Sequence, residues 1–369
     1  MEGELIMTDK NYKYINSLKG LGMIAVVLGH SGSPFSSYVY LYHMALFFFI
    51  SGYFYKDTYD DNPLLVIKKR IKKLYIPFIG YELMFMFLRN IFINLHLYSN
   101  EAMLKIKSLR DIIDNLKKII TLNSTEPLLA TIWFLTTLFY VNIIYVTIRY
   151  IIRKMKIRNE YIIFLIITII YLIGFYMFEN NIDLKAFINP NRKKVPDLFL
   201  RIFDYRNFII LLIFHLGYLY NKYENKVNMD KYLVITFSLI LLYNAYKVGS
   251  IDIALNKYTN PIYFIINALL GIYINIYLAK INILSNSRIL QYIGKNSLIV
   301  MIFHLLAFKL VNSVQIFIYN QPYEKLASFP FFINKNGWWF VYTLVGIFVP
   351  LMIISLYDYL KEVVKNRYN

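Results

Sequence analysis

The 369-residue chain contains no cysteine, so disulfides, thiol nucleophiles and thiolate metal sites are all excluded. Acidic residues are also scarce, because 22 Asp and Glu stand against 40 Lys and Arg and leave a net charge of +18. The sequence lacks a Gly-rich phosphate loop, a His-x-Glu motif and a paired-carboxylate metal motif. We therefore expect no bound metal and no bound cofactor.

The positive charge does not have the pattern of a nucleic-acid-binding protein. Most Lys and Arg residues lie in connectors beside apolar runs, not in one stripe interleaved with aromatic residues. Basic connectors of this kind face anionic lipid headgroups. We expect membrane lipid as a partner and no nucleic acid.

Apolar residues are in excess: 58% of the chain is hydrophobic and its mean hydropathy is +0.47. They gather in ten runs, most of them close to the roughly 20 residues that a helix needs to cross a bilayer. The predicted fold class is an all-α polytopic membrane protein with about ten transmembrane helices. The sixth and seventh runs are short, which a tilt, a break or a re-entrant hairpin would explain. The runs cover residues 18–34, 39–55, 74–97, 129–152, 160–178, 207–220, 232–247, 262–279, 297–318 and 338–360.

The short connectors predict the orientation, because Lys and Arg concentrate on the cytoplasmic side. The connector after the second run carries five basic residues between Lys68 and Lys73. The connector after the fourth run carries five more between Arg149 and Arg158. Both connectors should therefore be cytoplasmic.

Two longer connectors, 98–128 and 179–206, also contain acidic residues and are assigned to the outside, since long loops follow the charge rule less strictly. With an even number of spans, both termini face the cytoplasm. The expected organisation is a single transmembrane domain over residues 1–369, with cytoplasmic tails 1–16 and 361–369.

Two histidines lie in adjacent apolar runs, and an ionisable side chain inside hydrocarbon marks a candidate functional site because it is costly there. His30 is eleven residues beyond Lys19, which places it about 16 Å deeper, in the outer half of the membrane. His43 comes early in the second run, and Trp133 lies at the outer start of the fourth. These three side chains should share one layer. The alternatives are a hydrogen bond between helices for each histidine and an interfacial anchor for the tryptophan.

Three further polar side chains lie within predicted spans. His304 is about 10 Å from the cytoplasmic end of the ninth span, and its alternative role is again a hydrogen bond between helices. Glu82 and Arg89 are seven residues apart on one face of the third span. They form either a mutual or interhelical ion pair or a contact to substrate.

The order and spacing of these residues resemble those of the acyltransferase 3 family of integral-membrane proteins. The resemblance extends over essentially the whole chain. It is strongest to the branch of fucose 4-O-acetyltransferase-like and related cell-surface polysaccharide O-acetyltransferases. The matching pieces are Lys19-x10-His30, the block His-Met-x-Leu-Phe-Phe-Phe-Ile-Ser-Gly from His43, the basic stretch before Phe78, Trp133-Phe-Leu, and Phe303-His304.

The resemblance implies that an acyl group, usually acetyl, passes from cytoplasmic acyl-CoA to a glycan hydroxyl. The first-span motif of the family is Arg-x10-His with an essential histidine. Here His30 matches, and Lys19 replaces the arginine, which keeps the charge but loses the bidentate fork. The family's Arg-x-x-Arg before the third span corresponds to Arg70-x-x-Lys73, again with one lysine.

Two more positions carry over from the family. A serine and a glycine that end its second span correspond to Ser51 and Gly52, and Trp133 matches the tryptophan of its fourth span. The basic cluster before the third span would bind the donor phosphates, or would only be the positive-inside signal. The candidate substrate-binding residues are Lys19, Ser51, Arg70, Lys73, Glu82, Arg89, Trp133 and His304.

The catalytic candidates are His30 and His43. A sugar hydroxyl is a poor nucleophile at neutral pH, and a histidine can remove its proton as it attacks a thioester. His30 is the candidate general base. His43 would orient the acceptor, stabilise charge near the tetrahedral intermediate or carry an acetyl-imidazole in a covalent relay. We predict an acyl-CoA-dependent O-acetyltransferase, with a flippase or exporter of polysaccharide or lipid-linked sugar as the alternative.

The expected partners are acetyl-CoA as acyl donor, a glycan acceptor and proteins of polysaccharide synthesis. The acceptor would be a capsule, an exopolysaccharide or a lipid-linked sugar. Heavy use of Ile, Lys, Asn and Tyr is typical of an AT-rich bacterial genome. The expected location is therefore the inner membrane of a bacterial cell.

Overall fold

The computed structural model describes residues 9–99, 105–184 and 197–368. These residues form helices joined by turns, and one isolated bridge between Asp252 and Lys257 is their only β-type pairing. The described part of the chain is therefore all-helical, as the sequence predicts. The α-helices are α1 (Asp9–His30), α2 (Ser36–Tyr40), α3 (His43–Tyr53), α4 (Pro63–Arg70), α5 (Ile76–Asn94), α6 (Leu109–Ile120), α7 (Trp133–Lys154), α8 (Glu160–Glu179), α10 (Asp197–Leu200), α11 (Tyr205–Tyr223), α12 (Lys231–Tyr243), α13 (Pro261–Lys280), α14 (Asn282–Ser285), α15 (Arg288–Lys295), α16 (Ser297–Ile318) and α17 (Trp338–Tyr368).

Six helical stretches among the described residues are long and apolar enough to cross a membrane. The other predicted spans correspond to α1, α3, α11 and α12, of which α3 and α12 have only 11 and 13 residues. α1 and α11 are long enough, but both contain charged residues. The count of ten spans and the orientation stay predictions. The six stretches are Pro63–Asn94, Pro127–Lys154, Glu160–Glu179, Pro261–Lys280, Ser297–Ile318 and Trp338–Val364.

Several predicted boundaries differ from the helices. α1 begins at Asp9, inside the predicted tail 1–16, and α17 continues to Tyr368, through most of the predicted tail 361–369. Residues 1–8 and 369 lie outside the described part. α4 continues into α5 through a π-helical turn at Ile71–Tyr75, which carries two of the basic residues.

The predicted second span, 39–55, is not one helix. α2 ends at Tyr40 and α3 begins at His43, because Tyr42 between them has the non-helical angles φ −145° and ψ −21°. The ring of Tyr42 lies over Gly271 of α13, where a Cβ atom would be 2.1 Å from the Tyr42 Cγ atom. This packing breaks the helix and places His43 at the first position of α3.

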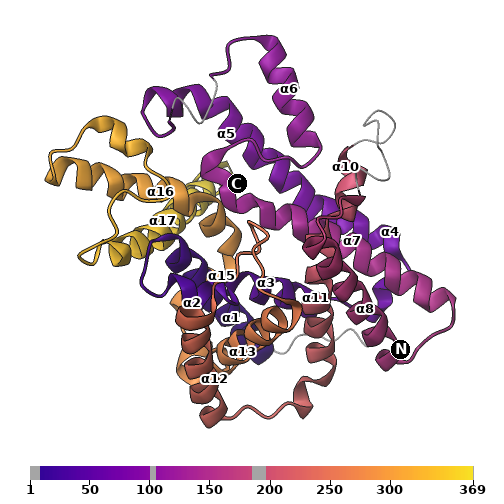
Figure 1. Cartoon of the computed structure of the whole chain (residues 1–369). Coiled ribbons are helices and arrows are strands. Elements are labelled where there is room, and N and C mark those ends of the chain that lie inside the picture. Colours follow the sequence, from indigo (N-terminus) through magenta and orange to yellow (C-terminus); the bar gives the residue numbers. More distant parts are fainter. Residues whose placement is uncertain (1–8, 100–104, 185–196, 369) are drawn as a thin grey trace.

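Figure 1 shows α1, α3, α13 and α15 near the middle of the molecule, with α16 and α17 on one side and α7, α8 and α11 on the other. α15 packs along α1, and glycines make the approach close. A Cβ atom on Gly20 would lie 2.3 Å from the Leu290 carbonyl oxygen, and one on Gly294 would lie 1.9 Å from that of Asn16. Because α16 follows α15 directly, this contact determines the height of α16 beside α1.

Candidate functional site

Three histidines meet in the middle of the molecule. His30 is the last residue of α1, His43 is the first of α3, and His304 lies within α16. The ring centroids of His30 and His304 are 5.2 Å apart, and Tyr40 contacts both His30 and His43 at 6.1 and 4.9 Å. From the sequence, His304 is predicted about 10 Å from the cytoplasmic end of its span, away from His30 in the outer half of the membrane. That separation is wrong. α15 packs along α1 and α16 follows α15 directly, so the His304 ring lies against the His30 ring.

In each of the three histidines, the two ring nitrogens have different surroundings. Each Nδ1 lies within hydrogen-bond distance of a backbone carbonyl one turn earlier, and a carbonyl only accepts, so Nδ1 carries the proton and Nε2 the lone pair. Nε2 of His304 is buried without a partner among the described residues, and Nε2 of His30 and of His43 bonds to none of them. His30 and His43 line a cavity, so the Nε2 atoms of these two are available to a ligand. The accepting carbonyls are those of Val26, Val39 and Met301, at 2.9, 2.8 and 2.9 Å from Nδ1.

His30 and His43 line one small cavity, the histidine cavity, of about 30 Å³. That volume holds one or two waters or a group of similar size. Trp133 lines it too, so the structure brings together the three residues that the sequence assigns to one layer. The full lining is Val26, His30, Tyr40, His43, Met44, Thr131, Trp133, Asp252, Ile253, Ala254 and Met301.

Asp252 is a residue of this cavity that the sequence argument does not single out. It lies in the loop between α12 and α13, and its charge acts on His30 and on Tyr40. Nothing in its local sequence signals the role, since a single aspartate in a loop is common. Only the return of this loop over the ends of α1 and α2 places a carboxylate beside the histidines.

Two further cavities adjoin the histidine cavity. One, the apolar cavity, has about 180 Å³, is lined mainly by hydrophobic side chains together with Lys73, and shares Val26, Met44 and Met301 with the histidine cavity. The other, the arginine cavity, has about 100 Å³ and shares Trp133. The three cavities therefore follow one another, with the histidines in the middle.

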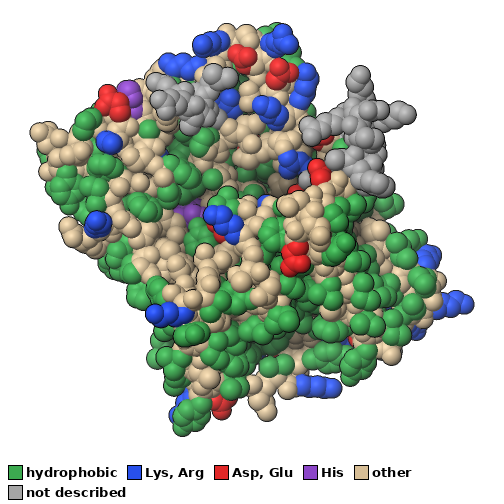
Figure 2. Space-filling model, viewed as in Figure 1, with side chains coloured by type: hydrophobic (Ala, Val, Ile, Leu, Met, Phe, Trp, Pro, Cys, Tyr) green, Lys and Arg blue, Asp and Glu red, His purple; other side chains and the backbone are tan. Residues whose placement is uncertain are grey.

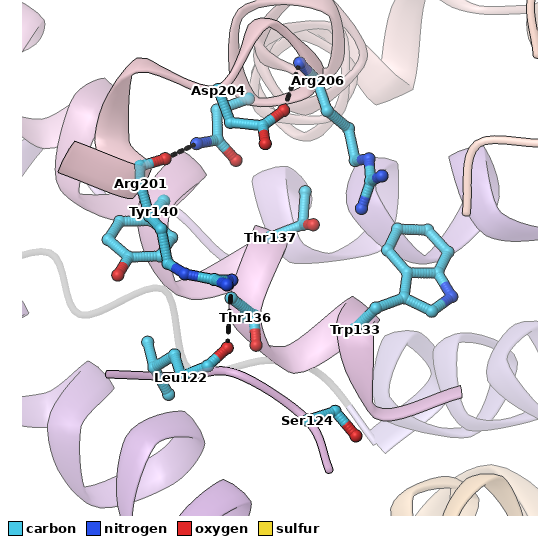
Figure 3. A pocket seen from close by; sticks show the side chains of 10 residues that line it. Leu122, Ser124, Trp133, Thr136, Thr137, Tyr140, Arg201, Asp204 and Arg206 are labelled. Atoms are coloured by element: carbon cyan, nitrogen blue, oxygen red, sulfur yellow. Dashed lines mark hydrogen bonds between the residues drawn. The ribbon is translucent and has the colours of Figure 1, made fainter. Parts of the chain in front are cut away.

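The arginine cavity is the most polar of the three (Figure 3). Arg201 lies just before α11 and Arg206 is the second residue of α11, whereas Leu122 and Ser124 come from the connector before α7. Both connectors, 98–128 and 179–206, are predicted from the sequence to be outside, but neither arginine is a candidate site residue there. The full lining is Leu122, Ser124, Trp133, Thr136, Thr137, Tyr140, Arg201, Asp204, Arg206 and Asn207.

Of the predicted basic residues, Lys73 lines the apolar cavity, and none of them lines the arginine cavity. The Nζ atom of Lys19 lies 4.8 Å from the centroid of the Phe54 ring. Lys19 is also close enough to Lys73 for their like charges to repel each other. Arg70 is half-buried, and its Nε atom has no partner among the described residues. Ser51 on α3 is half-buried and makes no side-chain hydrogen bond within the described residues. Of these candidates, Lys73 alone lines a cavity given above.

Glu82 and Arg89 do not pair with each other. Arg89 donates to the Glu126 carboxylate through Nη2 at 2.6 Å and Nε at 2.9 Å, with both side chains buried. Glu82 accepts from the Ser124 hydroxyl at 2.5 Å and from the backbone N–H of Thr125 at 3.0 Å. Both charges thus hold the connector before α7 against α5. Glu126, which is not singled out from the sequence, supplies the partner of Arg89 from this connector.

Figure 2 shows a histidine side chain inside a hollow on one face of the molecule, with basic and acidic side chains beside it. Within the described residues, no group of three or more histidine or carboxylate side chains is arranged to hold a metal ion. The site therefore consists of two ring nitrogens, a carboxylate, and cationic groups at either side. Such groups can move a proton and bind anionic parts of a substrate.

A comparison with protein-family models finds one described as an acyltransferase domain, which matches residues 12–357. A search of curated proteins and a search of solved structures found no match. The matched range contains the three histidines and all the residues that line the three cavities.

Proposed function

The chain belongs to the acyltransferase 3 family of membrane acyltransferases, and from this we propose that it moves an acetyl group from cytoplasmic acetyl-CoA to a hydroxyl of a cell-surface or lipid-linked glycan. The observation that carries the proposal is the pair of unoccupied Nε2 atoms, on His30 and His43, in one cavity. That cavity has an apolar cavity on one side and a polar one on the other. The apolar cavity suits the acyl-bearing arm of the donor, and the polar cavity suits a sugar.

The donor would enter beside Lys73. CoA carries several phosphates, which suit the basic residues of α4 and of the π-helical turn before α5, and the Arg70 Nε atom has no partner there among the described residues. Its acyl-bearing arm would lie in the apolar cavity, whose shared residues Val26, Met44 and Met301 lead to the histidines. The thioester carbonyl would then reach the histidine cavity.

The transfer needs one proton to move twice. Nε2 of His30 removes the proton of the acceptor hydroxyl while its oxygen attacks the thioester carbonyl. The tetrahedral intermediate then expels the CoA thiolate, which takes the proton from the imidazolium, so the products are the acetyl ester and CoA. The Asp252 carboxylate, whose charge acts on His30, stabilises the imidazolium between the two steps.

We propose direct transfer, with His43 orienting the acceptor hydroxyl toward His30. A covalent relay would instead place the acetyl group on Nε2 of His43 before the acceptor receives it. A flippase is the alternative function. The histidine cavity, at about 30 Å³, suits a reacting group better than a passing polymer.

Purified protein in liposomes with labelled acetyl-CoA tests the proposal. With an acceptor glycan present, we expect His30→Ala to lower acetyl transfer by about 10²–10⁴-fold, the usual contribution of a general base. His96→Ala is the matched control, because His96 packs against Tyr323 rather than in the histidine cavity. Glycan movement that persists in His30→Ala, without acetyl transfer in the wild type, would instead identify a transporter. Label on the protein in the absence of acceptor would favour the relay.

We also propose that the protein works in the inner membrane of a bacterial cell, beside proteins of polysaccharide synthesis. Mass analysis of the cell-surface polysaccharide with and without this chain tests that setting. Loss of ester-linked acetyl groups is the expected result.

A further inference from the structure

The arginine cavity contains two guanidinium groups that acetyl transfer to a neutral sugar would not require. Arg201 and Arg206 both reach into it, as Figure 3 shows. Among the described residues that line the cavity, Asp204 is the one acidic residue. Two cations against one carboxylate give the described lining of this cavity, about 100 Å³ in volume, a net charge of +1.

Arg206 is held in place but keeps free donors. Its Nε atom donates to the Asn256 side-chain oxygen at 2.8 Å, and its Nη2 atom donates to the Ala254 carbonyl at 3.0 Å. The guanidinium carbon lies 5.1 Å from the centroid of the Trp133 ring. An arginine has five N–H donors. The N–H groups of Arg206 other than these two have no acceptor among the described residues. A guanidinium fixed in this way is ready for a carboxylate or a phosphate.

Arg201 is still less satisfied. Among the described residues its guanidinium donates one hydrogen bond, from Nη1 to the Leu122 carbonyl at 3.1 Å. Burial lowers the pKa of this guanidinium below its ordinary value. A half-buried cation with unused donors is stabilised when an anion binds beside it.

The neutral part of the lining suits a sugar. Thr136 and Thr137 are buried, and their hydroxyls make no hydrogen bond to another described residue. They are on α7, one helical turn from Trp133, which also lines the histidine cavity. Ala254, the acceptor for Arg206, lines the histidine cavity as well. An anion on Arg206 would therefore lie one cavity away from the basic nitrogens.

From this arrangement we infer that the acceptor is an acidic glycan, whose carboxylate or phosphate is bound by Arg201 and Arg206 while a nearby hydroxyl reaches His30. The inference rests on the proposed acetyl transfer and names its acceptor class. The unused threonine hydroxyls would bind other hydroxyls of the same sugar. Neither Lys19 nor Lys73 lines the arginine cavity, so the two arginines are the cations assigned to this anion.

The test measures binding in the absence of acetyl-CoA, so that it does not depend on catalysis. The probes are a galacturonic acid trisaccharide and its methyl ester, and a hexose phosphate and the same neutral hexose. We expect the wild-type protein in nanodiscs to bind one acidic probe ~10-fold or more tightly than its neutral counterpart, as charge-assisted hydrogen bonds allow. Preference for the trisaccharide identifies a carboxylate, and preference for the hexose phosphate identifies a phosphate.

Substitutions then assign the preference to the cavity. Arg201→Gln and Arg206→Gln should each remove most of it, and Arg206→Lys should keep part because it keeps the charge. Arg110→Gln is the matched control, since the Arg110 side chain is 91% exposed on α6. Equal binding of acidic and neutral probes, no binding of either acidic probe, or a preference that survives both Gln variants would each overturn the inference. If acetyl transfer fails while the arginine-dependent preference holds, the fault lies with the proposed reaction.

Discussion

The Asp252 carboxylate lines the same cavity as His30 and His43, and its charge acts on His30. We expect Asp252→Asn to lower kcat by about tenfold, because the amide keeps the shape but no longer stabilises the imidazolium. KM for acetyl-CoA should change little, since the donor lies in the apolar cavity. Steady-state kinetics in liposomes measure both.

Asp61→Asn is the control for that substitution. Asp61 is exposed and pairs with Arg153, so its loss should leave kcat unchanged. An Asp252→Asn protein with the kinetics of the wild type would show that the carboxylate does not assist the base.

Residues of the site differ in how visible they are in the sequence. His30, His43 and His304 can be found from sequence because ionisable groups are rare within long apolar runs. Arg201 and Arg206 cannot, because arginines in a connector between spans have the same local pattern as any solvated loop. The ring nitrogen that each histidine offers is also a structural fact, since it follows from which nitrogen meets a carbonyl.

Helices α3 and α11 pack through two glycines. A Cβ atom on Gly52 would lie 1.8 Å from the Phe214 carbonyl oxygen, and one on Gly217 would lie 1.9 Å from that of Phe49. Gly52→Ala should therefore separate the helices and lower the free energy of unfolding by about 1–3 kcal/mol, the usual cost of overpacking. Thermal unfolding in detergent measures the change as a lower Tm.

Gly80→Ala is the matched control, because nothing lies within 4 Å of a Cβ atom at Gly80 on α5. That substitution should raise Tm slightly, since alanine favours a helix interior over glycine by roughly 0.5–1 kcal/mol. A Gly52→Ala protein as stable as Gly80→Ala would contradict the close packing of α3 on α11.

The stability of α6 should depend on pH, because an aspartate in its first turn has a shifted pKa. The pKa of the Asp111 carboxyl lies below its ordinary value because it accepts hydrogen bonds from the backbone N–H of Lys107 and from Ser108. The stabilisation of α6 is fully present above the unfolded pKa of about 3.9 and is lost as the pH falls through the lower folded pKa. Hydrogen exchange of α6 amides, corrected for intrinsic rates, should show faster opening there. In Asp111→Asn this pH dependence should vanish, and its persistence would refute the assignment.

Whole helices were predictable where the apolar run is long and unbroken, as in α7, α8, α13, α16 and α17. The predicted second span failed as a continuous helix because Tyr42 packs over Gly271, a contact between residues far apart in the chain. The position of α16 along α1, which brings His304 beside His30, was also not predicted, because it depends on the packing of α15 on α1. Hydropathy is a local property, whereas breaks and relative heights depend on contacts between helices.

At the scale of the whole molecule, the absence of cysteine makes the orientation testable. Arg110→Cys lies in the connector predicted to be outside, and Lys154→Cys is at the end of α7, in the connector predicted to be cytoplasmic. An impermeant maleimide should label the first in intact spheroplasts and the second only after permeabilisation. The wild-type chain is the unlabelled control. The reverse pattern would place the arginine cavity on the cytoplasmic side and exclude the proposed acceptor route.

The sequence by itself determined that this protein is helical and apolar and that thiol chemistry is excluded, and it singled out the histidines in apolar runs as candidate site residues. Those properties follow from composition and from the helical period, which residues carry locally. Only the tertiary structure decided that His304 meets His30, that Asp252 faces the histidines, and that two arginines line the next cavity. The reason is physical: these groups come from segments far apart in the chain, and close glycine contacts and returning loops bring them together.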